Sequence, residues 1–153
     1  MIFRVYLIPD DAKVKSDKKF FDFIPGKKFI RFSELQKIIS SLKGVKQDLE
    51  YCKQYNADKD CYYIYDNKGE LIRFEINYGD KKTLPNFTRV SICTKPSVPS
   101  KETRKLVVGF VEKILSKVPM QIYFVDEGKT ISLEELKKKI YEISALKGVG
   151  LKE

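Results

Sequence analysis

Two pairs of carboxylates are the residues of this chain whose type and spacing could do chemistry. Asp58 and Asp60 form an Asp-x-Asp pair ahead of an aromatic stretch, and Asp10 and Asp11 follow an apolar stretch. Paired carboxylates can hold Mg²⁺ or exchange protons with a substrate. Asp also favours turns, because its side chain hydrogen-bonds to nearby backbone groups. We favour the turn interpretation, and the sequence predicts no metal site.

The absence of histidine removes most of the usual catalytic chemistry. No histidine and no tryptophan occur among the 153 residues. The commonest general base, the commonest metal ligand and the serine–histidine–aspartate triad therefore have no member here. Neither a phosphate-binding glycine loop nor a G-x-S-x-G turn occurs. The sequence predicts a protein that is not an enzyme and that holds no cofactor.

Three cysteines, Cys52, Cys61 and Cys93, lack the close spacing of a zinc site. Buried or neutral thiols are the favoured interpretation. A disulfide between Cys52 and Cys61 is the alternative, and it would fit a hyperthermophilic source.

The charge is basic but evenly spread. The chain carries 30 basic and 21 acidic side chains, a net charge of +9, and only five of the basic residues are arginine. A basic surface supplies non-specific affinity for nucleic acid. Richness in lysine is also typical of an A/T-rich genome or of heat adaptation.

The sequence favours a small, basic binding module for nucleic acid or another polyanion, and a set of basic and aromatic residues is the candidate site. Basic residues precede the first expected helix and occupy a loop between two expected strands. Arg73, Arg89 and Lys95 are expected to share the sheet face turned away from the helices, with two tyrosines beside them to stack on bases. The candidate residues are Lys27, Lys28, Arg31, Tyr63, Tyr65, Arg73, Lys81, Lys82 and Arg89.

Two alternatives remain open for these residues. A solvated sheet face would carry the same arginines and tyrosines as cross-strand pairs, and Glu75 on that face favours this interpretation. The protein could instead be a protein–protein regulatory or assembly subunit, including a viral or defence accessory. A homo-oligomer would belong to that class.

The strands that must position these residues follow from alternating apolar residues. The pattern predicts strands over 3–7, 61–66, 71–78, 89–95 and 120–126. The turn residues 66–69 predict a hairpin. Two shorter extended pieces, 20–24 and 28–32, are expected to pair around Pro25 and Gly26.

Apolar stripes with capping residues predict the helices. One begins at Ser33, where Gln36 completes a capping box, and another begins at Ser100 and ends before Pro119. A third begins at Ser132 with Glu135. A further short helix is indicated within 46–56.

Together these elements predict a single α+β domain over residues 1–153. We expect a mixed, mostly antiparallel sheet with two to three helices packed on one face. The helix over 100–118 is long enough to join its neighbouring strands in parallel. The element order resembles that of ferredoxin-like domains with additions, and this resemblance implies no function. No membrane span and no signal peptide are indicated, so we expect a cytoplasmic protein.

Overall fold

A seven-stranded sheet organises the computed structural model, which describes residues 3–16, 21–78 and 88–139. Every strand pairing in it is antiparallel. In spatial order the strands are β4 (Lys46–Gln47), β5 (Tyr62–Asn67), β6 (Glu70–Tyr78), β7 (Thr88–Lys95), β1 (Val5–Pro9), β8 (Met120–Phe124) and β9 (Lys129–Ile131).

The helices and a second small sheet complete the described fold. The helices are α1 (Phe32–Ser41), α2 (Leu49–Tyr55), α3 (Lys101–Leu115) and a fourth whose described residues are 133–139. Strands β2 (Lys13–Ser16) and β3 (Phe21–Ile24) pair with each other as a separate hairpin.

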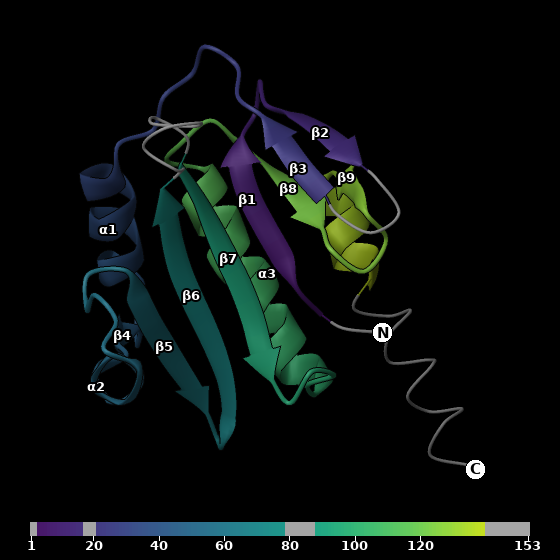
Figure 1. The fold of residues 1–153 in the computed structure, drawn as a ribbon. Coiled ribbons are helices and arrows are strands. Elements are labelled where there is room, and N and C mark those ends of the chain that lie inside the picture. The colour runs from purple at the N-terminus through teal and green to yellow at the C-terminus, as the bar shows by residue number, and fades with distance from the viewer. Residues whose placement is uncertain (1–2, 17–20, 79–87, 140–153) are drawn as a thin grey trace.

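Strands β7 and β8 run parallel to each other with β1 between them. Each is antiparallel to β1, and α3 connects them across one face of the sheet. The predicted parallel crossover is therefore confirmed. Figure 1 shows α3 lying behind β7 and β1.

One face of the sheet forms the main core beneath α1, α3 and the fourth helix. Leu35 and Ile39 of α1, Val107 of α3 and Leu136 of the fourth helix are all buried there. They pack on alternate strand residues, as a half-buried antiparallel sheet requires. Those strand residues are Val5, Leu7, Ile72, Phe74, Ile76, Val90, Ile92, Ile122 and Phe124.

On the opposite side of the sheet, here called the outer face, described residues outside the sheet pack on its two ends. At one end, Tyr51 of α2 packs on Tyr62 of β5. At the other, Phe23 of the β2–β3 hairpin packs on Tyr6 and Tyr123. Two arginines of the outer face, discussed below, contact these residues: Arg73 lies over Tyr51, and Arg89 lies over Phe23.

The β5–β6 hairpin forms around the predicted turn. Lys68 and Gly69 have φ angles of 54° and 92°, and the Gly69 N–H donates to Oδ1 of Asp66 at 2.8 Å. Two consecutive residues with positive φ are typical of the turns that join twisted strands. This hairpin is confirmed.

Several details of the expected fold are wrong. The described residues form four helices rather than two to three, and the ferredoxin-like order is not confirmed. Every strand pairing described in the large sheet is antiparallel, so the expected mixed sheet is wrong. The sheet also gains strands that no alternation pattern indicated, β4 and β9. The pieces 20–24 and 28–32 do not pair, since β3 pairs with β2 and the backbone N–H groups of Lys27 and Lys28 donate to Asp11 instead.

Helix α1 begins at Phe32, whereas the sequence predicted Ser33 as the residue that caps its N-terminus. Its N-cap residue is Arg31, which makes no side-chain capping hydrogen bond, so the predicted box at Ser33 is wrong. Ile30 is buried and Phe32 packs against the core, and these tertiary contacts set the entry of the chain. The other two caps are confirmed, because Ser100 accepts from the Thr103 N–H and Ser132 from the Glu135 N–H.

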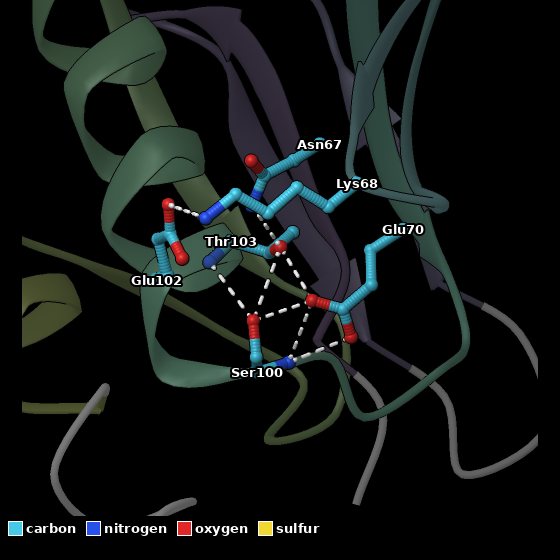
Figure 2. Close-up of polar contacts among 6 residues, drawn as sticks. All are labelled: Asn67, Lys68, Glu70, Ser100, Glu102 and Thr103. Carbon is cyan, nitrogen blue, oxygen red and sulfur yellow. Dashed lines mark hydrogen bonds and ion pairs between the residues drawn. The ribbon is translucent and has the colours of Figure 1, made fainter.

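A carboxylate on the sheet ties the start of α3 to the β5–β6 turn. Glu70 accepts hydrogen bonds from the Ser100 N–H at 2.9 Å and from the Thr103 hydroxyl at 2.6 Å, and also from the Ser100 hydroxyl. Asn67 donates to the Thr103 hydroxyl, and Lys68 lies 3.7 Å from Glu102 (Figure 2). A negative charge at a helix N-terminus is favourable, so this cluster fixes α3 on the sheet.

Within the described residues, no helix combines the length and the apolar composition needed to cross a membrane.

Candidate functional site

Arg73, Arg89 and Lys95 lie on the outer face, as expected. In the β6–β7 ladder Arg73 pairs with Cys93, Leu71 with Lys95 and Asn77 with Arg89. Residues two or four apart along a strand share a face, so the three cations lie opposite the buried Phe74 and Ile92. Their shared face is confirmed.

The expected position of Tyr63 and Tyr65 is wrong. Both lie on the core side, where Tyr63 is 1% exposed and Tyr65 packs edge-on against Phe110 of α3. The Tyr63 hydroxyl donates to the carbonyl of Asp60 at 2.9 Å. Tyr62 and Ile64 face outward instead. Both faces of β5 carry large residues, so alternation alone could not assign them.

Tyrosines from α2 and β5 lie near Arg73. The ring centroids of Tyr51 and Tyr62 are 4.8 Å apart, and those of Tyr51 and Tyr55 are 4.7 Å apart. We call these three residues the tyrosine stack. Tyr55, at its outer end, is 61% exposed. The sequence analysis missed this feature, although the spacing of Tyr51 and Tyr55 by four residues places two rings on one helix face.

A groove of about 650 Å³ runs between α2 and the outer face, and we call it the outer groove. Aromatic and cationic side chains from α2, β4, β6 and β7 line much of it. These are Lys46, Tyr51, Tyr55, Arg73 and Lys95.

The acidic residues of the outer groove are largely engaged by the protein itself. Asp48 caps α2 by accepting from the Tyr51 N–H, and one of its oxygens lies 3.9 Å from Nε of Arg73. Asp66 is engaged by the Gly69 N–H in the hairpin turn. Arg73 also lies over the Tyr51 ring, 5.6 Å from its centroid. Lys46 and Lys95 are exposed, and neither forms an ion pair with another described residue. Glu50 is an exposed acidic residue that also lines the outer groove.

A smaller cavity of about 120 Å³ lies beside the tyrosine stack. In it the Tyr62 hydroxyl donates to Oε1 of Glu75 at 2.9 Å, and burial with this hydrogen bond raises the pKa of Tyr62. Burial also raises the pKa of the Cys93 thiol, although Arg4 and Arg73 oppose that shift. Both groups are therefore protonated near neutral pH, which is the form that is not nucleophilic.

Arg89 is used in packing at the other end of the outer face. Its guanidinium carbon lies 5.0 Å from the Tyr6 ring centroid and 5.7 Å from that of Phe23. A guanidinium close to aromatic rings makes a favourable cation–π contact, which here links Arg89 to the β2–β3 hairpin through Phe23.

Three further candidate residues, all among the described residues, do not line the outer groove. Lys27 and Lys28 donate their backbone N–H groups to Oδ2 of Asp11 at 2.7 and 2.9 Å, and Nζ of Lys28 lies 2.6 Å from Asp10. Arg31 is exposed at the start of α1. Lys81 and Lys82 lie outside the described residues.

Asp58 and Asp60 form a turn. Oδ1 of Asp58 accepts the Asp60 N–H at 2.9 Å, and the Gln47 side chain donates to Asp60 at 3.2 Å. The three cysteines, all within the described residues, form no disulfide.

The fold and the outer groove thus define an α+β domain whose surface groove is lined by tyrosines and by both basic and acidic side chains. Comparisons of the chain with protein-family models, with curated proteins and with solved structures find no match.

Proposed function

We propose that this protein is a non-enzymatic binding module for nucleic acid or another polyanion, and that the outer groove takes a single strand. The observation that carries the proposal is the exposed ring of Tyr55, which ends the tyrosine stack beside Lys46, Arg73 and Lys95. A cytoplasmic location, where single-stranded RNA is present, is part of the proposal.

Stacking is the contact that Tyr55 offers. Its neighbour Tyr51 contacts both Tyr62 and Arg73, so the platform is ordered before a ligand arrives. Every base has a flat aromatic face, and stacking on a side chain contributes about 1–3 kcal/mol per base. A strand lying along the groove would gain this energy without any sequence preference.

Phosphate contacts would come from Lys46 and Lys95. Both side chains are exposed, and they enter the groove from β4 and β7. Lysine acts towards phosphate as a point charge, and each contact releases counterions from the strand. Binding should therefore weaken steeply as salt rises.

The experiment is a fluorescence-anisotropy titration of labelled oligo(dT) and oligo(rU) at about 50 and 200 mM salt. Tyr55→Ala should weaken binding by about 5- to 100-fold. Phe29→Ala is the matched control, because Phe29 is a 53% exposed aromatic residue outside the groove. The double variant Lys46→Glu/Lys95→Glu should weaken binding and make it less dependent on salt. The control is the double variant Lys117→Glu/Lys129→Glu, outside the groove, which should have a much smaller effect on both.

Two results would count against the proposal. One is no binding of either oligonucleotide at the lower salt, where phosphate contacts are strongest. The other is binding that Tyr55→Ala and Phe29→Ala leave equally unchanged, which would place any affinity elsewhere on this basic surface.

The alternative function, a protein–protein regulatory or assembly subunit, has its own structural support. A second groove lies over the helix layer on the other side of the sheet, between α1 and α3.

A further inference from the structure

The second groove, here called the helix groove, has a volume of about 470 Å³ and lies between the end of α1 and the exposed side of α3. Its apolar walls are made by Leu42, Leu106 and Phe110. Phe110 is held in place by edge-on contacts with Tyr65 and Phe74, at centroid distances of 5.2 and 5.5 Å. The apolar surface is therefore already shaped in the described structure.

A glycine in the middle of α3 lies in this groove. Gly109 occupies the interior of the helix Lys101–Leu115 and is exposed. Glycine destabilises a helix interior relative to alanine, because it loses more backbone freedom on folding. A Cβ atom built on Gly109 would meet nothing within 4 Å. No packing within the described chain therefore explains its small size, and the space above it is open to a partner.

Lysines surround the helix groove. Lys43 follows α1, and Lys105 and Lys113 lie on the same side of α3 as Gly109. All three are exposed, and none of them forms an ion pair with another described residue. The acid at the groove, Glu102, has its Oε1 atom 3.7 Å from Nζ of Lys68. Figure 2 shows these two side chains directed towards each other. The rim therefore presents uncompensated positive charge.

We propose that the helix groove binds an acidic amphipathic helix of a partner protein. An apolar channel between two helices accepts the apolar side of a third, whose side chains recur at i, i+3, i+4 and i+7. Gly109 lets the partner backbone approach α3 closely, between Leu106 and Phe110. Carboxylates along the edges of the partner helix meet Lys43, Lys105 and Lys113, which selects it over neutral or basic helices.

The chemistry of the groove favours a helix over nucleic acid. Its walls are aliphatic, apart from Phe110, whose ring is engaged by Tyr65 and Phe74. The groove contains no arginine. Phosphates would gain from the lysines but leave the apolar walls uncovered, whereas an amphipathic helix covers them. This proposal is independent of the outer groove, which lies on the opposite side of the sheet.

The test uses two synthetic peptides of about 16 residues, long enough to form helix when stapled. Both carry leucine at i, i+3, i+4 and i+7, and the other positions are glutamate in one peptide and lysine in the second. Binding is followed by fluorescence anisotropy, and ¹H–¹⁵N spectra locate it on the protein. We expect the acidic peptide to bind at least tenfold more tightly than the basic one.

Variants of α3 test whether the acidic peptide binds in the helix groove. Gly109→Leu fills the groove and should weaken binding of the acidic peptide by at least tenfold. The control is Gln54→Leu, which places a leucine on the exposed side of α2 and should leave the binding of the acidic peptide unchanged. Gly109→Ala should raise the denaturant midpoint while weakening binding, which separates occlusion of the groove from loss of folding.

A second set of variants reverses the charge of lysines in the helix groove. Lys105→Glu with Lys113→Glu should abolish the preference for the acidic peptide, whereas Lys59→Glu with Lys129→Glu should keep it. Three results overturn the proposal: no binding of the acidic peptide at about 1 mM protein, equal binding of both peptides, or displacement of the peptide by an oligonucleotide whose amide shifts map to Leu106 and Gly109. The last would make the groove a nucleic-acid site.

Discussion

The carboxylate of Glu70 accepts hydrogen bonds from both the backbone N–H and the hydroxyl of Ser100. These residues are 30 positions apart, and the contact joins the first residue of β6 to the N-cap of α3. The helix is therefore capped twice, by its own Ser100 hydroxyl and by a carboxylate from the sheet. Because α3 forms one wall of the helix groove, this contact also positions that surface.

We predict that Glu70→Ala destabilises the protein by about 2–3 kcal/mol, because it removes three hydrogen bonds to a charged acceptor and leaves partly buried donors unsatisfied. The free energy of unfolding in urea measures this loss. The control is Glu102→Ala, in the first turn of α3. This change removes an exposed ion pair with Lys68 and should cost about 0–1 kcal/mol. Equal losses in the two variants would contradict a special role for Glu70.

We predict a pH-dependent contribution from Asp11. Hydrogen bonds from the backbone N–H groups of Lys28 and Lys27 lower the pKa of the Asp11 carboxyl below its usual value of 3.8, against some desolvation. The folded state therefore favours the charged form, and this stabilisation is fully present above about pH 4 and is lost as the pH falls towards the lowered pKa.

The measurement compares the free energy of unfolding of the protein and of Asp11→Asn between pH 7 and pH 2.5. Other carboxyl groups titrate in both proteins, so their contributions largely cancel. We expect the difference between the two proteins to be constant down to about pH 4 and to shrink below it. A difference that stays constant to the lowest pH would show that Asp11 has an ordinary pKa.

We predict that Gly44→Ala is more destabilising than Gly69→Ala. Both glycines have positive φ angles, 84° and 92°, so an alanine costs about 1–2 kcal/mol in backbone strain at either position. At Gly44 the added Cβ would also lie 2.6 Å from Cε2 of Tyr65, whereas at Gly69 it would meet nothing within 4 Å. Displacing Tyr65 from Phe110 should add about 1–3 kcal/mol. Thermal and urea unfolding of the two variants give this difference directly.

The sequence was informative wherever one local pattern had one physical solution. The β5–β6 hairpin follows from turn residues that tolerate positive φ, and the caps at Ser100 and Ser132 follow from hydroxyls that accept nearby N–H groups. Alternation along β6 and β7 placed Arg73, Arg89 and Lys95 on one face, because successive strand residues point to opposite sides.

Only the tertiary structure could decide between alternatives that look alike locally. The stretch from Cys61 to Tyr65 has large side chains on both faces, so its orientation depends on the ladder with β6 and on the space beneath α1 and α3. The cap of α1 lies at Arg31 because Ile30 is buried in the core and Phe32 packs against it. The short strands β4 and β9 are stabilised by their neighbours, and no pattern of their own predicts them.

The candidate sites divide in the same way. The amino-acid sequence alone determined the basic charge, the lack of histidine and the face of the sheet on which Arg73 and Arg89 lie. The tertiary structure alone brought Tyr51 and Tyr55 beside Tyr62 and Arg73, and left Gly109 in an open groove between two helices. Composition and alternation are local properties, whereas a groove exists only where elements distant in the chain pack side by side.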